Sequence, residues 1–283
     1  MIKPIALSAT HMECRNLKES LPALTDLLAF EKISEGPGEV KLKHPNTDWL
    51  LYVHETGGDA PVKQMHNHWG VRVATTQEVD AAYDYLSAER EKYGIRQIAK
   101  PSYNHGSYSL YFLEPGTNGW EIECYEGALR KESMAERLGG VRAPHWARPY
   151  PAERFPGRGY VPQGFTHGTL ACNDIKASWK FYTDVLGLAV HQANDHVFYI
   201  KHPNTKCYVV CAERKDFKRF SPNFRFTITL GSQDDIAQAH QWLKGSGQEL
   251  GVAELRPGQS HGAASSFLLR DPDNNWWEVT SPN

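Results

Sequence analysis

The stretch Lys43-His44-Pro45-Asn46-Thr47 returns as Lys201-His202-Pro203-Asn204-Thr205, 158 positions later in the chain. Two further segments repeat at nearly the same distance: Asp26-Leu27-Leu28 returns as Asp184-Val185-Leu186, and Trp120-Glu121 returns as Trp277-Glu278. A constant spacing between repeated segments indicates an internal duplication. We expect positions that both copies keep to serve folding, whereas positions that only one copy keeps are candidates for chemistry.

The length and composition are those of a globular protein with two cores. The chain has 283 residues, of which 40% are hydrophobic and 23% charged, and its formal net charge is −2. This balance gives no electrostatic reason to expect a nucleic acid or a membrane surface as partner. No apolar run approaches the roughly 18 residues of a membrane span, and Met1-Ile2-Lys3-Pro4 lacks the apolar core of a signal peptide. We therefore expect a cytoplasmic protein.

The cysteines indicate neither disulfides nor a structural zinc site. Their number is odd and no pair has CxxC spacing: Cys14, Cys124, Cys172, Cys207 and Cys211. This pattern predicts free thiols packed in strands.

Each copy divides again into two units of a strand, a helix and several more strands. Helices are predicted at residues 17–28, 77–93, 174–185 and 235–244, with Asn16 and Asn173-Asp174 as N-terminal caps. The alternating and apolar runs that predict strands are residues 5–14, 40–44, 49–54, 69–73, 108–113, 120–124, 165–172, 197–202, 207–211, 224–230, 267–269 and 276–280.

Prolines, glycines and arginines break this pattern at residues 128–163, which we interpret as a linker between an N-terminal half, 1–127, and a C-terminal half, 164–283. The predicted fold class is α+β. Four βαβββ modules are expected to form two paired mixed sheets, each curled around a cavity.

Two segments of the C-terminal half resemble a known superfamily. Asp174-Ile175-Lys176-Ala177-Ser178-Trp179-Lys180-Phe181-Tyr182-Thr183-Asp184-Val185-Leu186-Gly187-Leu188 is similar to the opening helix of the vicinal oxygen chelate superfamily, and Asp271-Pro272-Asp273-Asn274-Asn275-Trp276-Trp277-Glu278 resembles its closing strand. That superfamily includes glyoxalase I, bleomycin-resistance proteins and type I extradiol dioxygenases. The resemblance implies that two modules face each other and hold a metal at the first strand of each and at the last strand of one or both.

Three residues occupy the ligand positions that this resemblance implies. His68 begins the first strand of the second module, and Glu121 lies on the closing strand of that module. His167 lies on the first strand of the third module. The equivalent of His167 in the first module is Ala9. The equivalent of His68 in the fourth module is Phe224 or Arg225, depending on a gap of one residue.

The pairing of modules decides whether these residues form one site. If modules pair within each half, both sites lack a histidine, unless His11, two residues beyond Ala9 on the same strand face, replaces it. If the second module pairs with the third, His68, Glu121 and His167 form one complete set and all losses fall on the other pair. We favour this crossed pairing, with His11 as the competitor for the place of His167.

Two imidazoles and one carboxylate leave three adjacent positions of an octahedral ion open. This arrangement suits a non-haem Fe(II) that binds a substrate and O₂ together. We expect Fe(II) as the cofactor, with Mn(II) or another divalent first-row metal as the alternative.

The segment from Asn104 to Pro115 resembles the extradiol dioxygenase signature, in which a His and a Tyr precede the ligand Glu. The resemblance implies that His105 shuttles a proton and that Tyr111 hydrogen-bonds the substrate. The segment departs from the signature in two places, because His105 is unusually close to Tyr111 and Thr117 stands where Gly is usual. In the other copy His261 is kept and Phe267 is assigned to the Tyr111 position.

The leading hypothesis is an Fe(II)-dependent extradiol-type dioxygenase of aromatic compound catabolism, which cleaves a catechol-like dihydroxy aromatic with O₂. A metal-dependent glyoxalase or isomerase and a non-catalytic binding protein of the bleomycin-resistance type are the alternatives. The sequence determines neither the substrate nor the oligomeric state, and a homo-oligomer is compatible with it. His44 and His202, kept in both copies, are expected to serve the hairpin rather than to bind metal.

Overall fold

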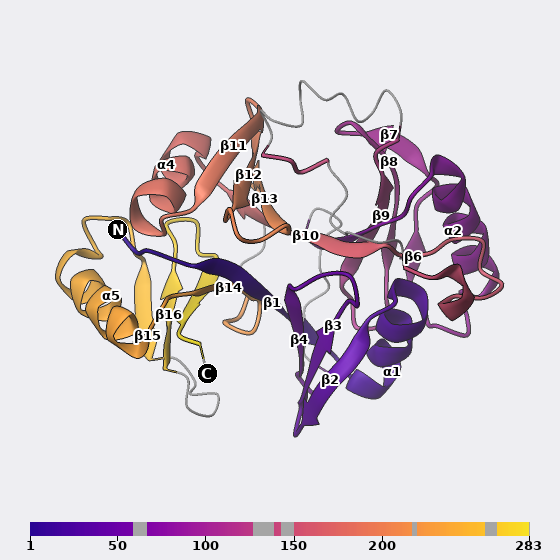
Figure 1. The fold of residues 1–283 in the computed structure, drawn as a ribbon, viewed down its shortest axis with the longest axis horizontal. Helices are drawn as coiled ribbons and strands as arrows, with labels where there is room; N and C mark the ends of the chain where they lie inside the picture. Colours follow the sequence, from indigo (N-terminus) through magenta and orange to yellow (C-terminus); the bar gives the residue numbers. More distant parts are fainter. Residues whose placement is uncertain (59–66, 127–138, 143–149, 217–219, 258–264, 283) are drawn as a thin grey trace. The chain divides into compact units, whose positions relative to one another are not determined.

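The computed structural model describes residues 1–58, 67–126, 139–142, 150–216, 220–257 and 265–282 (Figure 1). Its elements run strand, helix, then three or more strands, four times over, so the predicted α+β fold of four βαβββ modules is confirmed. None of the described helices is long and apolar enough to cross a membrane.

The modules have the following bounds. The first comprises β1 (Ala6–Cys14), α1 (Leu17–Pro22), the π-helical turn η1 (Ala23–Leu27), β2 (Glu31–Gly36), β3 (Glu39–Lys43) and β4 (Leu50–Glu55). The second comprises β5 (His68–Arg72), α2 (Thr76–Ala88), β6 (Gln97–Ile98), β7 (Ser102–Asn104), β8 (Ser107–Leu113) and β9 (Gly119–Cys124). After a 3₁₀ turn, η3 (Ala152–Arg154), the third comprises β10 (Gly164–Cys172), α4 (Ile175–Lys180), the π-helical turn η4 (Phe181–Val185), β11 (Ala189–Asn194), β12 (Val197–Lys201) and β13 (Tyr208–Glu213). The fourth comprises β14 (Arg225–Thr229), α5 (Gln233–Ser246), β15 (Glu254–Pro257), β16 (Ser266–Arg270) and β17 (Trp276–Thr280).

Two compact units share the chain. Unit 1 contains Met1–His11 and Leu170–Asn283, and unit 2 contains Met12–Thr169. The chain therefore passes between units inside β1 and β10. The predicted boundaries at 1–127, 128–163 and 164–283 describe the sequence duplication rather than these units, and they stay a prediction.

Unit 2 has the strand order β10-β5-β9-β8-β6, with β7 paired to β8, and a further run β1-β4-β3-β2. β5 runs parallel to β9 and antiparallel to β10. The first strand of the second module thus pairs with the first strand of the third, as the crossed arrangement predicts. This pairing brings β5, β9 and β10 side by side, and helix α2 packs against β8 and β9.

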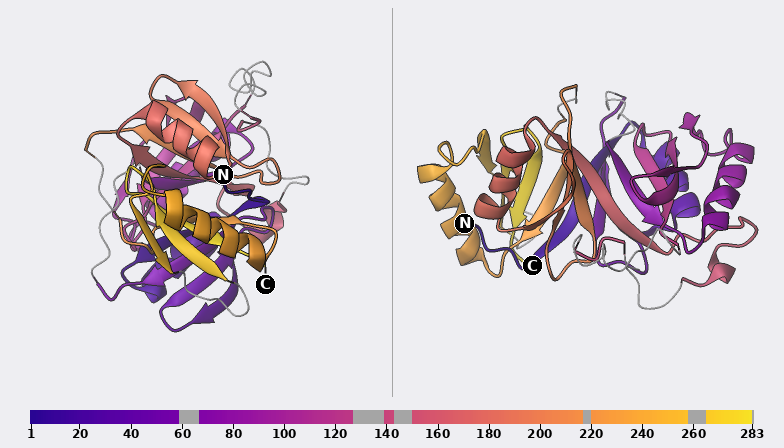
Figure 2. Two further views of the ribbon diagram at one scale, coloured as in Figure 1. Left: turned by 90° about the vertical axis from the view of Figure 1, so that its left-hand side faces the viewer. Right: turned by 90° about the horizontal axis from the view of Figure 1, so that it is seen from above.

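Unit 1 repeats the same plan. Its strand orders are β15-β16-β17-β14-β1 and β11-β12-β13-β10. β14 runs parallel to β17 and antiparallel to β1, so the fourth module pairs with the first. Helix α5 packs on β16 and β17, and the views of Figure 2 show it lying along these strands.

Polar caps begin the helices where the sequence predicts. The Asn16 side chain accepts a hydrogen bond from the Glu19 amide, and the Asp174 side chain accepts two, from the amides of residues 176 and 177. Thr75 and Glu78 form a capping box at the start of α2. This helix ends at Ala88, five residues before its predicted end.

Large aromatic side chains fill the interior of unit 2. Trp49 and Phe165 have ring centroids 4.8 Å apart, and Phe30 lies 5.1 Å from Phe165 and 5.6 Å from Trp120. All five cysteines are buried free thiols, as predicted. Four of them lie in strands, and Cys207 directly precedes β13.

The duplicated Lys-His-Pro-Asn-Thr loops hold neighbouring backbone, which agrees with a structural role. His44 Nε2 donates to the backbone carbonyl of Pro162 at 3.2 Å, and the side-chain amide of Asn46 donates to the backbone carbonyl of Gln163. In the second copy His202 Nε2 donates to the carbonyl of Pro4 at 3.0 Å. Each loop therefore fastens the segment that leads into a first strand, β10 in one case and β1 in the other.

Candidate metal centre

Three adjacent strands of unit 2 carry the predicted ligands to one place. Gly70 of β5 lies opposite Glu121 of β9 and opposite His167 of β10. His68 precedes Gly70 by two residues, so its side chain leaves β5 on the same face. His68, Glu121 and His167 therefore project from the same side of neighbouring strands.

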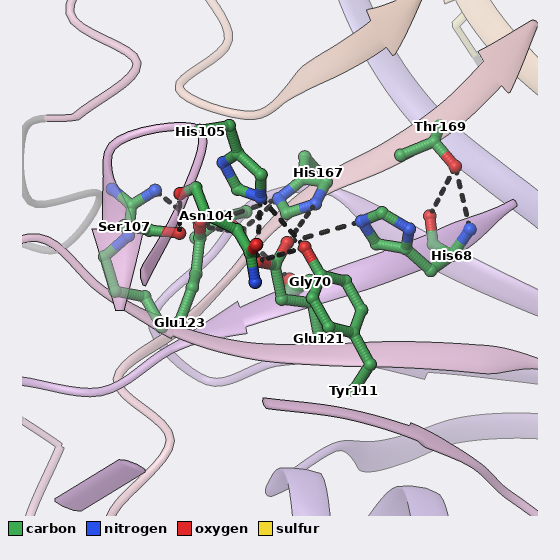
Figure 3. A network of polar contacts seen from close by, with 12 residues as sticks. His68, Gly70, Asn104, His105, Ser107, Tyr111, Glu121, Glu123, His167 and Thr169 are labelled. Atoms are coloured by element: carbon green, nitrogen blue, oxygen red, sulfur yellow. Dashed lines mark hydrogen bonds and ion pairs between the residues drawn. The ribbon is translucent and has the colours of Figure 1, made fainter. Parts of the chain in front are cut away.

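The donor atoms of these three residues converge. His68 Nε2 and His167 Nε2 each lie 3.3 Å from Glu121 Oε2, and all donor atoms lie within 4.8 Å of one another (Figure 3). Three donors on one face of an ion, each about 2.1 Å from it, stand about 3 Å apart, so the group fits a divalent transition metal. Within the described ranges no other group of three His, Cys, Asp or Glu side chains meets this spacing.

Protons on the histidines balance the negative charge of the Glu121 carboxylate. Burial alone would raise the pKa of Glu121, but the charge of His105 and hydrogen bonds from three histidines hold it well below its ordinary value. Burial would lower the pKa of His167, but its hydrogen bond to Glu121 and the nearby negative charge of Glu123 outweigh burial and raise it to about 9. Imidazoles must be neutral to bind a metal, so an ion entering this group displaces protons.

His105 and Tyr111 both contact the other oxygen of the central carboxylate. The Tyr111 hydroxyl donates to Glu121 Oε1 at 2.8 Å, and His105 Nε2 lies 2.8 Å from that hydroxyl and 3.3 Å from Oε1. Glu121 is 1% exposed, whereas the side chain of His105 is 41% exposed. His105 therefore joins the buried carboxylate to solvent.

A tight turn presents His105. Asn104 and Ser107 pair across the β7–β8 hairpin, and both residues between them have positive φ, 37° at His105 and 90° at Gly106. Two successive positive φ values are typical of the type I′ hairpin turn. Arg142 Nη2 donates to the His105 carbonyl at 3.2 Å and occupies the space a Cβ at Gly106 would need. Thr117, at the signature's Gly position, has φ of 75°, which explains the usual preference for glycine there.

The register identifies the equivalents of these residues in unit 1. Thr227 lies opposite Glu278 and opposite Ala9, so Ala9 replaces His167, and Arg225 is the counterpart of His68. Phe224 is thereby excluded from that position. The assignment of Phe267 to the Tyr111 position was wrong: Tyr111 faces Glu121, whereas Leu268 faces Glu278. Counting gaps in sequence alone misplaced this strand by one residue. His261 lies outside the described residues.

Side chains of the protein itself surround the carboxylate of unit 1. Arg225 Nε donates to Glu278 Oε2 at 3.1 Å, Thr227 Oγ1 donates to the same oxygen at 3.1 Å, and His11 Nε2 lies 3.2 Å from it. Burial would raise the pKa of Glu278, but His11 and Arg225 lower it. His11 therefore belongs to the group around Glu278, and His167 is the histidine that joins Glu121.

Several residues around His167 carry no motif by which the sequence alone would identify them. Gly70, Arg72, Glu123 and Thr166 all contact this histidine or the carboxylate beside it. The signal in the sequence for Gly70, Arg72 and Glu123 is their loss from the other copy, whereas the place of Thr166 is taken by Ser8, which keeps a hydroxyl. Thr227, Thr229 and Thr280 stand at the positions of Gly70, Arg72 and Glu123.

A family model matches part of the sequence. Residues 164–279 match the model described as Glyoxalase/Bleomycin resistance protein/Dioxygenase superfamily. No curated protein matches the chain.

Solved structures resemble the whole fold at low sequence identity. Glyoxalase I from Zea mays has a TM-score of 0.65 at 14% identity, over 98% of this chain and 92% of that one. A putative dioxygenase from Bacillus subtilis subsp. subtilis str. 168 has a TM-score of 0.63 at 10% identity, over 99% of this chain and 86% of that one. Both relationships extend through all four modules and establish the fold.

Proposed function

We propose that the chain is a member of the Glyoxalase/Bleomycin resistance protein/Dioxygenase superfamily, whose model residues 164–279 match and whose fold the whole chain shares. We further propose that His68, Glu121 and His167 bind Fe(II) and that the protein is an extradiol-type dioxygenase. Its substrate would be a catechol-like dihydroxy aromatic. The observation that carries the proposal is the convergence of two imidazoles and one buried carboxylate, with an accessible His and a Tyr hydroxyl on the second carboxylate oxygen.

The donor set supports a metal with open positions. Two neutral imidazoles and one carboxylate supply three ligands, which is the pattern of non-haem Fe(II) enzymes that bind substrate and O₂ together. The bound metal would supply the site at which a catecholate and O₂ meet. Mn(II) or another divalent first-row ion fits the same donors.

The second pair of residues supports proton transfer during such a reaction. A catechol that binds through both oxygens gives up hydroxyl protons, and His105 Nε2 is the accessible acceptor nearest the carboxylate. Burial lowers the pKa of His105, but the charge of Glu121 raises it above its ordinary value. The Tyr111 hydroxyl stays protonated, because burial and the charge of Glu121 raise its pKa. Tyr111 is therefore a hydrogen-bond donor rather than a base.

The proposed reaction is balanced. The ring bond between one hydroxylated carbon and its unhydroxylated neighbour breaks, both atoms of one O₂ enter the product, and no other oxidant or reductant is needed. The hydroxylated carbon becomes a carboxylic acid and its neighbour an aldehyde, or a ketone where that carbon is substituted, so the product is a ring-opened, coloured hydroxydienoic acid that carries both groups. A broad panel of catechols is therefore the appropriate set of substrates.

The test begins with protein purified without oxygen and loaded with Fe(II). We expect about one ion per chain, and on admitting air about one O₂ consumed per catechol with a yellow product. Glu121→Gln should lose most of the metal, while Glu278→Gln, the equivalent change in unit 1, should keep it. No O₂ uptake over the panel, together with turnover of a hemithioacetal under nitrogen, would instead identify a glyoxalase-type isomerase. A chain that binds catechols without metal and without turnover would be a binding protein.

A further inference from the structure

We propose that Glu123 is a positioning residue for the metal centre, and that it acts through the Thr166 hydroxyl to hold His167 with Nε2 toward the ion. The inference rests on the proposed function, because it takes His167 as a ligand. Glu123 lies two residues after Glu121 on β9, so the two carboxylates leave the strand on the same face. Glu121 is itself one of the three donors, and Glu123 lies on the Nδ1 side of the His167 ring.

The two nitrogens of His167 face different partners. Nε2 points to Glu121 Oε2 at 3.3 Å, whereas Nδ1 lies 3.0 Å from Thr166 Oγ1 and 3.6 Å from Glu123 Oε1. The distance of 3.6 Å is too long for a hydrogen bond, so the direct link runs through the hydroxyl. Thr166 Oγ1 in turn has two acceptors within reach, the Gly70 carbonyl at 3.0 Å and Glu123 Oε1 at 3.1 Å. The negative charge of the carboxylate favours Glu123 as the acceptor. A hydroxyl donates one hydrogen bond and accepts others, so it can accept from the Nδ1–H group and donate to the carboxylate.

This chain of donors selects one tautomer of the neutral ring. With Nδ1 carrying the proton, the lone pair of His167 stands on Nε2, the nitrogen that faces the other two ligands. A bulge in β10 lets the side chains of Thr166 and His167, which are neighbours in the sequence, lie beside each other. The register with β5 shifts between Phe165 and His167, which inserts Thr166 as the extra residue beside the histidine.

Arg72 fixes the charge of the carboxylate. Its Nη2 donates to Glu123 Oε1 at 2.6 Å, its Nη1 donates to the Val141 carbonyl, and its guanidinium lies 4.7 Å from the Tyr125 ring centroid. Arg72 and Glu123 are both buried. Buried ion pairs of this kind contribute little net stability compared with well-packed neutral side chains.

The other copy shows that the fold does without this pair. In unit 1 the two positions hold Thr229 and Thr280, which lie opposite each other on β14 and β17 as Arg72 and Glu123 do on β5 and β9. The same unit has Ala9 where unit 2 has His167, yet β1 keeps the bulge, between Leu7 and Ala9. The bulge belongs to the fold, whereas the buried ion pair is present in the copy that keeps the histidine. This association supports a role of the pair toward the histidine rather than toward the sheet.

The experiment measures Zn²⁺ affinity by competition with a chromophoric chelator in the full chain. Thr166→Val removes the hydroxyl at nearly constant volume and leaves the Arg72–Glu123 pair intact, so it is the decisive variant. We expect it to lower Zn²⁺ affinity on the order of 10- to 100-fold, Thr166→Ser to restore affinity to within about threefold, and Thr280→Val, in unit 1, to leave it unchanged.

Glu123→Gln is expected to lower affinity by about tenfold, and to add little in combination with Thr166→Val because both changes interrupt one path. If the two effects multiply, Glu123 acts on the ion by its charge alone and the positioning role is wrong. Nitrogen-15 NMR of the His167 ring in the Zn²⁺-loaded protein gives a second readout. A slowly exchanging proton on Nδ1 is expected in the wild type and in Thr166→Ser, but not in Thr166→Val.

His167→Ala separates this inference from the proposed function. If His167→Ala binds Zn²⁺ as tightly as the wild type, the proposed metal centre itself is wrong. If His167→Ala loses the metal while Thr166→Val and Glu123→Gln both keep wild-type affinity and the Nδ1 proton, the centre stands and only the positioning role is overturned.

Discussion

The ring of His167 occupies the space that a side chain at Gly70 would need. A Cβ built on Gly70 would lie 2.1 Å from Cε1 of that ring and 2.4 Å from Nδ1. In unit 1 the pair is reversed, with Thr227 opposite Ala9. A large and a small residue have thus changed places across the two strands, and the copy with glycine is the copy that has room for an imidazole ligand.

Gly70→Ala is therefore expected to displace His167. The ring must move or rotate, because an added Cβ at such a distance overpacks the site at a cost of about 1 to 3 kcal/mol. We expect metal affinity to fall at least about tenfold. Equilibrium dialysis measures the affinity and urea unfolding measures the stability. Gly36→Ala is the control, since nothing lies within 4 Å of a Cβ there. In a His167→Ala background the stability cost should largely disappear, and a cost that persists there would contradict a clash with the ring.

The choice between His167 and His11 predicts opposite results for two alanine variants. His167→Ala should remove most of the bound metal, because two remaining donors no longer define one face of an ion. His11→Ala should keep about one ion per chain, since His11 contacts Glu278 rather than Glu121. Metal analysis of desalted protein, with circular dichroism to show that both variants fold, decides between them. Retention by the first variant and loss by the second would reverse the assignment.

Loss of His105 should affect turnover far more than metal content. His105→Ala removes the accessible proton carrier, and we expect kcat on a cleaved catechol to fall on the order of 10²-fold. Tyr111→Phe removes a hydrogen bond to Glu121 and should lower kcat about tenfold or less. His196→Ala is the matched control, because His196 also lies at an exposed hairpin turn, beside Glu213. Oxygen uptake is measured together with the iron content of each variant. Equal kcat values for His105→Ala and His196→Ala would contradict the role of His105.

His44 is expected to make the fold sensitive to acid. Burial lowers its pKa to about 4, although its bond to the Pro162 carbonyl opposes this, whereas an unfolded histidine titrates near 6.5. Above pH 6.5 both states are neutral at this residue. As the pH falls from 6.5 toward 4 the unfolded chain takes up a proton that the folded chain does not, so stability is lost, by at most about 3 kcal/mol.

Urea unfolding at several pH values between 4 and 7 measures this loss. His44→Gln should be less stable at neutral pH but should lose less stability in the acid window. His202→Gln should change the slope in the same direction and less, because the pKa of His202 is also lowered but by a smaller amount. An unchanged slope in His44→Gln would contradict this origin of acid sensitivity.

The modular plan of the fold follows from the sequence alone. The repeated Lys-His-Pro-Asn-Thr loops, the caps at Asn16 and Asp174 and the apolar alternation of the inner strands predict four βαβββ modules, because local chemistry and side-chain period depend on few neighbours. The strands missed in prediction lie at the ends of the strand orders or beside them: β2, β6, β7, β11 and β15. All six residues of β2 are exposed, so an edge strand of this kind carries no burial pattern to read.

The site depended on contacts between distant parts of the chain. Comparison of the two copies selected His68, Glu121 and His167, but only the pairing of β5 with β9 and β10 puts their donor atoms within 4.8 Å. Register also decided that Arg225, not Phe224, is the counterpart of His68, since a shift of one residue turns every side chain to the other face. The roles of Gly70 and Glu123 emerged in the same way. The residues next to Gly70 and Glu123 in the sequence do not indicate that either contacts His167. His167 lies nearly a hundred residues after Gly70 and 44 residues after Glu123.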